Sequence, residues 1–328
     1  MAKYKIAWMP GDGVGHDVME AARIVLDRLK LDAEYVPCDI GWEFWCQEGD
    51  ALPDRTVKAL KETTCGLFGA ITSKPQSEAK EELIPELKGK GLVYFSPIVK
   101  LRQMFNLHTN MRPCKSYPGN PLNYRGTKIT NPSGEDVAID QVVFRENTEG
   151  MYGGVEFFPL LEPVYTALCA NPKMKKWKDK GLENVALSTR IMSKQGCTNI
   201  CKQAFEFAKE TGRTRVTLIE KPNVLRETGG LMMRCFRDVA KNYPDIRADD
   251  ANIDAICMWM LRTHRITRCW WRKICLATSS ATCARVLSAD SASHRAPTSV
   301  TTTPCSNRPT VRHRNMPANT RSTQSRCF

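Results

Sequence analysis

Hydrophobic and polar positions follow two periods along the first part of the chain. Residues 4–9 form a short apolar run typical of a β-strand, a Pro-Gly-Asp-Gly turn follows, and residues 17–29 carry apolar side chains at helical spacing. Residues 33–38 and 65–71 predict two further strands, and residues 60–64 predict the end of a helix. This alternation of strand and helix predicts an α/β layered fold with a largely parallel sheet.

The same alternation continues to Leu261 and then stops. Strands are predicted at residues 137–144, 185–189 and 216–219, and helices at residues 194–211 and 228–242 and from residue 252 onward. Beyond Leu261 neither period is present, and residues 262–328 contain no glycine and no tyrosine. A segment of this composition buries little apolar surface, so we expect a poorly ordered tail.

Charge is divided unevenly at the same point. The 328 residues carry a net charge of +13, which would suggest a nucleic-acid partner. Residues 262–328 hold twelve basic side chains and one acidic one, whereas the remaining 36 basic and 34 acidic side chains nearly cancel. The charge therefore belongs to the tail, and nucleic-acid binding through its arginines is an alternative that lacks any recognition motif.

Residues 11–15, GDGVG, follow a strand and open a helix, as a phosphate-binding loop would. The dinucleotide fingerprint needs a third glycine one residue later. The spacing therefore favours a tight structural turn. No apolar run is long enough for a membrane span, and the N-terminus does not resemble a signal peptide, so a cytoplasmic protein is expected.

Three arginines stand in blocks that suggest anion binding. Arg102 and Arg112 flank a predicted strand or loop end, and Arg145 lies in FRENTEGMYGG. Guanidinium groups bind carboxylates through paired hydrogen bonds. Tyr152 follows in a glycine-rich turn, where its hydroxyl could act as a general acid, and Lys221 in EKPNVLRETGG could act as a base.

A carboxylate-rich block, DDANID, comes last. It contains Asp249, Asp250 and Asp254, and carboxylate oxygens are ligands that Mg²⁺ and Mn²⁺ prefer. Each of these residues taken alone would be read as an ordinary solvated side chain. Their order along one chain makes that interpretation hard to sustain.

These blocks, GDGVG, LRQ, MRP, FRENTEGMYGG, EKPNVLRETGG and NIDA, occur in the order seen in the β-decarboxylating dehydrogenases, and the chain resembles that isocitrate/isopropylmalate dehydrogenase family over about residues 4–261. The resemblance implies oxidation of a 2-hydroxy acid by NAD or NADP, followed by decarboxylation. It also implies an α/β, two-domain fold with a central cleft.

The resemblance assigns roles to particular residues. It implies that Arg102, Arg112 and Arg145 hold the substrate carboxylates, that Lys221 is the base and that Tyr152 is the acid. Two further positions complete the set, Thr72 beside the nicotinamide and Asp254 as a ligand of Mg²⁺ or Mn²⁺. Family members share active sites between two subunits through the equivalents of the lysine and the aspartate, so a homodimer is implied.

Substrate choice depends on the segment before Arg102. Ser96 lies where isocitrate enzymes place a serine that binds the additional carboxylate, and this favours isocitrate. Ile98 is apolar where some isocitrate enzymes carry asparagine, which leaves isopropylmalate and homoisocitrate as alternatives. The resemblance places residues 1–95 and 240–261 in a large nucleotide-side domain and residues 96–239 in a small domain that carries the dimer contacts.

The abrupt end of the resemblance suggests a shift of reading frame. Residues 269–278, CWWRKICLAT, can be encoded so that another frame reads LVAENMFGD, which resembles the family at this point. Residues 302–328 can be encoded so that the same frame reads YAVFEPTHGSAPKYAGQYKVNPIAMF, whose Lys-Tyr pair resembles NADP enzymes. We therefore expect residues 262–328 to be an out-of-frame tail that replaces two metal carboxylates, the adenosine loop and the elements that complete the large domain.

Overall fold

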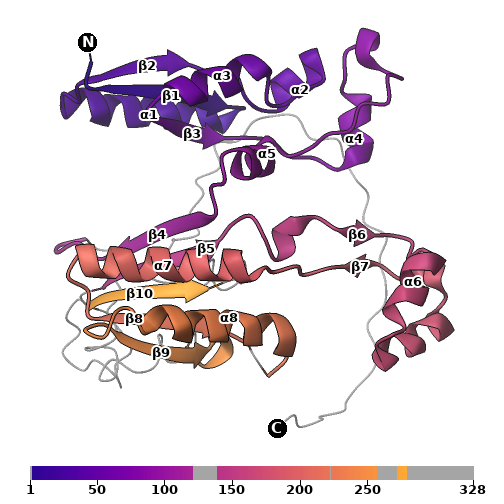
Figure 1. The fold of residues 1–328 in the computed structure, drawn as a ribbon. Coiled ribbons are helices and arrows are strands. Elements are labelled where there is room, and N and C mark those ends of the chain that lie inside the picture. Colours follow the sequence, from indigo (N-terminus) through magenta and orange to yellow (C-terminus); the bar gives the residue numbers. More distant parts are fainter. Residues whose placement is uncertain (1, 121–138, 222, 257–271, 279–328) are drawn as a thin grey trace, which may run out of the picture. The chain divides into compact units, whose positions relative to one another are not determined.

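The computed structural model describes residues 2–120, 139–221, 223–256 and 272–278, all of which fall in one compact unit, Met1–His294 (Figure 1). Their strands form a three-stranded sheet, a five-stranded sheet and a two-stranded ribbon. Helices lie between most of the strands, as expected for an α/β chain. In this part of the chain no helix is long and apolar enough to span a bilayer.

The first sheet is parallel and has the strand order β2-β1-β3. Its strands and the helices between them are β1 (Tyr4–Gly11), α1 (Val14–Arg28), β2 (Ala33–Pro37), α2 (Trp42–Glu48), α3 (Asp54–Glu62) and β3 (Cys65–Ala70). The strands expected at residues 4–9, 33–38 and 65–71 and the helix expected at residues 17–29 are confirmed. The short helix α2 had no periodic signal long enough to predict it.

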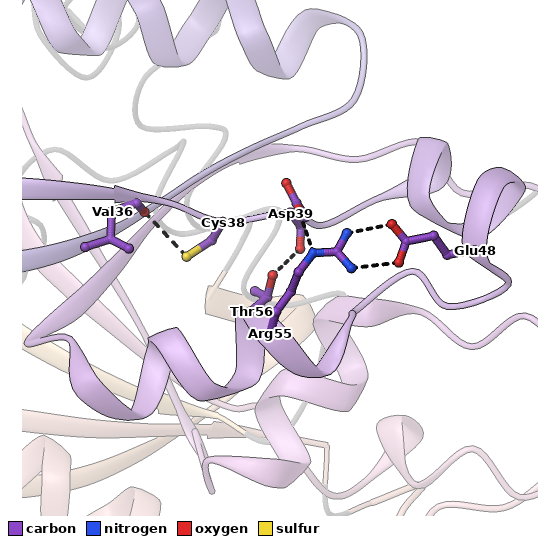
Figure 2. Close-up of polar contacts among 6 residues, drawn as sticks. All are labelled: Val36, Cys38, Asp39, Glu48, Arg55 and Thr56. Carbon is purple, nitrogen blue, oxygen red and sulfur yellow. Dashed lines mark hydrogen bonds and ion pairs between the residues drawn. The ribbon is translucent and has the colours of Figure 1, made fainter.

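The core of the first sheet lies between β1, α3 and the later helix α5 (Pro97–Met104). Ala7 and Leu52 are fully buried there, and Leu101 and Phe105 pack against the cluster. Arg55 of α3 binds two carboxylates beside this core, one before α2 and one at its end (Figure 2). Its guanidinium donates to Asp39 at 2.6 Å and to both carboxylate oxygens of Glu48 at 2.6 and 2.8 Å. This fork ties the end of α2 to the start of α3.

The second sheet has the strand order β4-β5-β10-β8-β9. Its strands are β4 (Thr109–Lys115), β5 (Asp140–Glu146), β8 (Arg215–Glu220), β9 (Arg247–Asn252) and β10 (Arg272–Thr278). All adjacent pairs are parallel except β4 and β5. The strands expected at residues 137–144 and 216–219 are confirmed where they are described. Because β9 pairs with β8, residues 247–252 share a sheet with the segment expected to form the small domain, and the domain boundary itself stays a prediction.

Helices α7 (Lys194–Glu210) and α8 (Arg226–Ala240) pack together against this sheet, and both confirm predicted helices. Their contact buries a cluster that includes Phe205, Leu218 and Met232. Strand β8 is buried at all six positions. Strands enclosed in this way read as continuous apolar runs, which explains why the sequence alone located β8.

Strand β10 corrects one expectation. The composition of residues 262–328 predicts no strand, yet residues 272–278 pair in parallel with both β5 and β8. Parallel pairing uses backbone N–H and C=O groups, which every sequence carries, and ICLA within this strand is an apolar run. The remainder of the tail lies outside the described residues.

Shorter elements connect the two sheets or extend from them. They are α4 (Gln76–Glu81), η1 (Pro85–Leu87), η2 (Met151–Gly153), β6 (Glu156–Phe157), α6 (Glu162–Leu168), η3 (Pro172–Lys180), η4 (Leu182–Asn184) and β7 (Leu187–Ser188). Strands β6 and β7 pair antiparallel as a ribbon. The strand predicted at residues 185–189 is therefore present, although it is only two residues long.

Candidate active site

Polar residues gather where the parallel strands of the second sheet end. Arg145 occupies the next-to-last position of β5, Lys221 follows β8 directly, and Asp254 lies two residues after β9. Since β4 runs antiparallel to β5, its first residues lie at the same edge, and Asn110 pairs with Arg145. The carboxyl edge of a parallel sheet is where open α/β folds bind ligands.

Arginine side chains meet around one tyrosine at this edge. The guanidinium carbon of Arg102 lies 5.6 Å from the ring centroid of Tyr152, and that of Arg145 lies 5.4 Å from it. Arg112 follows Asn110 by two residues on β4, so it shares the face that carries Arg145, and its Nε donates to Asn110 Oδ1 at 3.0 Å. The structure thus brings together four of the residues singled out in the sequence.

The charge of Arg145 is held in an unfavourable place. Its side chain is only 5% exposed, and burial lowers its pKa, as do the nearby charges of Arg112 and Arg102. Nη2 donates to Asn147 Oδ1 at 3.4 Å, while the buried Nε has no hydrogen-bond partner among the described residues. A buried guanidinium without a carboxylate costs free energy, so an anion bound beside it would remove that cost.

Helix α5 supplies Arg102 and Ser96. Ser96 is the N-cap residue of α5, but its side chain makes no capping hydrogen bond, and Arg102 lies in the last turn. Both residues are partly exposed. A pocket of about 590 Å³ lies beside this helix, and Ile98, Leu101 and Arg102 are among the residues that line it. The surface near the arginine is therefore largely apolar.

Lys221 forms a second polar group at the same edge. Its Nζ lies 2.7 Å from Asp254 Oδ2, and its backbone N–H donates to Glu220 Oε1 at 3.2 Å. Glu220 is 2% exposed and also pairs with Arg190 at 3.0 Å. The interactions described for Lys221 and Asp254 do not include Arg102, Arg145 or Tyr152. The buried ion pair of Glu220 and Arg190 thus fixes the backbone from which the Lys221 side chain extends.

The DDANID block divides into different roles. Asp249 accepts hydrogen bonds from Arg215 and, at 2.6 Å, from Thr217 Oγ1, and Asp250 lies 4.0 Å from Arg237. Asp249 is therefore engaged in the sheet, and the interpretation of it as a metal ligand is not supported. The Asp254 carboxylate is exposed and fits one position of a Mg²⁺ or Mn²⁺ site. Within the described ranges no group of three metal-binding side chains completes such a site.

The glycines of the GDGVG loop allow its backbone to pack closely against the end of β3. A Cβ on Gly11 would lie 1.9 Å from the carbonyl oxygen of Ala70, and a Cβ on Gly15 would lie 2.7 Å from it. Both glycines let the loop lie against the end of β3. This agrees with the tight structural turn that the spacing favoured. The backbone of Ala70 occupies the space beside Gly11 and Gly15.

Asp12 of the same loop organises the surroundings of Thr72. Its carboxylate accepts hydrogen bonds from the backbone N–H groups of Thr72 at 3.0 Å, Trp42 at 2.6 Å and Glu43 at 3.0 Å. Thr72 itself is partly exposed after β3, so it could contact a cofactor. The structure therefore holds the predicted cofactor residue in place through a residue that the sequence had not assigned to the site.

Asn147, Glu220 and Asp12 were not predicted as functional residues. Each lies within two positions of a residue or glycine that was singled out, in the strings REN, EK and GDG. The sequence carried no signal for them because their side chains act on neighbouring groups. Burial is what reveals them, since all three are polar and at most 6% exposed.

Comparison with known proteins establishes the family. Residues 5–270 match the family model described as isocitrate/isopropylmalate dehydrogenase. The chain belongs to this family. The crystal structure of isocitrate dehydrogenase from Methylococcus capsulatus has a similar fold, with a TM-score of 0.65. The two chains are 28% identical in sequence, and the match covers 87% of this chain and 69% of that one.

Curated relatives include several members with different names. Protein DlpA of Legionella pneumophila is 39% identical over 79% of this chain and 39% of its own length. The 3-isopropylmalate dehydrogenase of Archaeoglobus fulgidus is 34% identical, over 78% of this chain and 62% of its own length. The homoisocitrate dehydrogenase of Methanocaldococcus jannaschii is 32% identical, over 79% and 63%. This family member thus spans less than two thirds of the length of these relatives.

Proposed function

We propose that this chain derives from an enzyme that oxidises a 2-hydroxy acid with a nicotinamide cofactor and decarboxylates the product. The observation that carries the proposal is the convergence of Arg102, Arg112 and Arg145 around Tyr152. Such a cluster binds a substrate with two or three carboxylates through charge-assisted hydrogen bonds. Family membership supports the same reaction class.

Each catalytic role falls on a residue with suitable surroundings. Lys221 would take the proton of the substrate hydroxyl during oxidation, and Tyr152 would return a proton to carbon after loss of CO₂. Arg145 holds a carboxylate at the base of the site because its guanidinium is buried and fixed by Asn147. NAD or NADP supplies hydride acceptance when bound, with Thr72 on its nicotinamide side, and we favour NADP. Asp254 would serve as one ligand of Mg²⁺ or Mn²⁺, which would polarise the substrate oxygens.

We propose isocitrate as the substrate. Ser96 supports this choice because its hydroxyl is not used to cap α5 and lies on the helix that carries Arg102. A hydroxyl there suits the additional carboxylate of a tricarboxylate.

A specific observation favours 3-isopropylmalate as the second candidate, with homoisocitrate as a further alternative. Ile98 and Leu101 line the pocket beside Arg102, and an aliphatic substituent would bury apolar surface there. Relatives named for isopropylmalate and homoisocitrate are also about as similar as those named for isocitrate. The two readings differ in whether Ser96 or Ile98 contacts the third substituent of the substrate.

The assembly proposed is a cytoplasmic homodimer in which each active site uses residues from both subunits. The support is that Lys221 and Asp254 pair with each other, and that their described interactions do not include Tyr152. A partner's arginine cluster would then complete the site.

The test compares two proteins made from one gene. The 328-residue chain is expected to be inactive, because the tail replaces metal carboxylates and the adenosine loop, whereas a chain with one base restored near codon 262 is expected to reduce NADP. Both are assayed with isocitrate, 3-isopropylmalate and homoisocitrate, with Mg²⁺ and with NAD or NADP. Arg145→Lys in the restored chain should lower kcat/KM at least about 100-fold, since a bidentate contact is lost.

Two results would overturn the proposal. Robust turnover by the 328-residue chain would contradict the shift of reading frame. Absence of turnover by a folded, restored chain with all three acids would contradict the reaction. A preference for 3-isopropylmalate that Ile98→Asn reverses would select the second candidate.

A further inference from the structure

The 3₁₀ helix η3 carries all the lysines of the segment between β6 and β7. Its nine residues read PKMKKWKDK, so residues 172–180 have a net charge of +4. A 3₁₀ helix has three residues per turn, and the lysines therefore occupy all three rows of its surface. Every one of them is exposed: Lys173, Lys175, Lys176, Lys178 and Lys180. The positive charge is thus spread over several directions and is not gathered into one groove.

Hydrogen bonds hold the backbone of η3 in place. The side chain of Asn171 caps the helix by accepting from the backbone N–H of Lys173 at 3.1 Å. The hydroxyl of Tyr165, a buried residue of α6, donates to the carbonyl oxygen of Lys175 at 3.2 Å. The lysine side chains therefore extend from an ordered support, which reduces the entropy lost when a partner binds.

Acidic neighbours neutralise little of this charge. Within the described part of the chain, the one ion pair of these lysines joins Lys178 to Glu162 at 3.6 Å, and both side chains are more than half exposed. Exposed pairs of this kind contribute little free energy. The ammonium group of Lys176 lies 5.3 Å from the ring centroid of Trp177, a contact that leaves its charge in place. The lysines therefore remain available to an anionic partner.

Apolar side chains are exposed close to the lysines. Trp177 of η3 is 40% exposed, and Leu161 and Phe158 are 51% and 72% exposed. Leu161 directly precedes Glu162, the residue that contacts Lys178, so the apolar and basic groups are near one another. Tryptophan and aliphatic side chains beside lysines are typical of surfaces that lie in the interfacial region of a bilayer.

The chemistry of the patch distinguishes between possible partners. Residues 158–184 contain no arginine, the side chain best suited to paired contacts with nucleic acids, whereas lysine acts as a point charge toward a diffuse anionic surface. Proteins that bind single strands combine a basic groove with stacked aromatic rings, and neither of the two described cavities is lined by residues 158–184. A twofold contact between copies centred here would bring like charges together.

We propose that η3, together with Leu161 and Phe158, forms a basic patch that docks on a membrane surface containing anionic phospholipids. The lysines lie among the headgroup phosphates, and Trp177 and Leu161 enter the interfacial region. Each lysine near such a surface strengthens binding about fivefold. The contact is peripheral, so it requires no helix that spans the bilayer, and it is independent of the proposed reaction.

The experiment measures binding of the 328-residue chain to vesicles of phosphatidylglycerol and phosphatidylcholine, with pure phosphatidylcholine vesicles for comparison. Residues 262–328 are also basic, so a local readout is needed, and hydrogen exchange of peptides covering residues 172–180 provides it. Their amides should exchange at least about fivefold more slowly with the anionic vesicles only. The protection should disappear in about 0.5 M salt, because exposed charges are then screened.

Two matched double variants test the lysines. Lys175→Gln combined with Lys176→Gln should raise the lipid concentration at half-maximal protection about 20-fold, since two headgroup contacts are lost. Lys88→Gln combined with Lys90→Gln removes the same charge from exposed positions outside the patch and should leave that concentration unchanged.

Fluorescence tests the apolar contact. Phosphatidylglycerol brominated in its acyl chains should quench the emission of Trp177, so Trp177→Phe should reduce the quenching. Trp8→Phe, in β1, is the control and should not reduce it.

Four outcomes would overturn the proposal. Vesicle binding without protection of residues 172–180 would assign the binding to residues 262–328. Equal protection by both kinds of vesicle would exclude recognition of anionic headgroups. Protection by a single-stranded RNA but not by vesicles would identify a nucleic acid as the partner, and protection that rises with protein concentration alone would identify a second copy. If the 328-residue chain does not fold, the same outcomes apply to the chain with the restored frame, which keeps residues 158–184.

Discussion

The carboxylate of Asp12 accepts three backbone N–H groups from two separate loops, the one that begins α2 and the one that follows β3. Gly41 makes this possible, because a Cβ there would lie 2.5 Å from the Asp12 oxygens. One buried side chain thus sets the position of both loops. Such residues stabilise a site without touching what it binds.

Replacement of Asp12 by asparagine tests this role. The amide keeps one acceptor oxygen but turns an NH₂ group toward N–H donors, so we expect the free energy of unfolding to fall by about 2–3 kcal/mol. Urea denaturation followed by tryptophan fluorescence measures the change, and Trp42 reports the loop directly. Asp245→Asn, at an exposed position, serves as the control and should change stability by less than about 0.5 kcal/mol. A change at Asp12 as small as the control's would show that the carboxylate is dispensable.

Side chains that the sequence singled out by type and spacing lie close together in the structure. Arg102 and Arg145 both contact the ring of Tyr152, while the roles of these three residues stay predictions. Asp249 did not follow its expected role, because its partner Arg215 lies 34 positions away and only strand pairing brings them together. Contacts across a sheet depend on register, which a single sequence does not specify.

At the scale of elements, α7 and α8 illustrate how a buried interface shapes chemistry. Cys197 and Cys201 of α7 and Cys235 of α8 lie in the core between the helices and the sheet. Burial, with a smaller contribution from Cys235, raises the pKa of Cys197 from 9.0 to about 12. The Cys197 thiol is therefore neutral and poorly reactive at physiological pH.

The buried thiol of Cys197 makes the free energy of unfolding fall as the pH becomes alkaline. The folded pKa of Cys197 is raised, so its contribution is fully present below pH 9.0 and is lost as the pH rises toward about 12. Between pH 8 and pH 10 we expect the free energy of unfolding to fall by about 1 kcal/mol through this thiol. Urea midpoints at the two pH values measure the fall. Cys197→Ala should reduce it, whereas Cys65→Ala, at an exposed thiol, should not. An unchanged pH dependence in Cys197→Ala would contradict the assignment.

Periodicity located the elements whose side chains pack on one side and missed those that do not. Strand β9 reads RADDAN, and its charged residues gave no strand signal. It forms because β8 offers a free edge, and because Asp249 finds Arg215 and Thr217 across the pairing. Helix α1 shows the reverse error, since its apolar spacing predicted the helix correctly but not that one apolar face would be exposed.

At the scale of the whole molecule the two sheets are unequally supported. Among the residues that the structure describes, the core of the second sheet holds fifteen buried residues with two helices packed on it, whereas the core cluster beside β1 in the first sheet holds six. The net charge has little bearing on this difference, because it belongs mainly to residues 262–328. The difference between the two sheets lies in how much apolar surface each buries.

Native-state hydrogen exchange should therefore show two levels of stability in the 328-residue chain. Amides of β1 and β3 are expected to exchange through an opening at least about 2 kcal/mol below that of β8, because less apolar surface is buried around them. Mass spectrometry at the level of peptides resolves the two sheets. Equal protection of β3 and β8 would show that the chain unfolds as one cooperative unit.

The buried charge of Arg145 has a consequence for how the protein is handled in the cell. Arg145 is 5% exposed, and its Nε has no hydrogen-bond partner in the part of the chain that the structure describes, so burial of this guanidinium costs free energy. By linkage, an anion that binds only the folded form lowers the population of unfolded chains by the factor 1 + [L]/Kd. Proteases that degrade unfolded chains would then leave more of this protein when its carboxylate ligand is abundant, so its lifetime would follow metabolite supply.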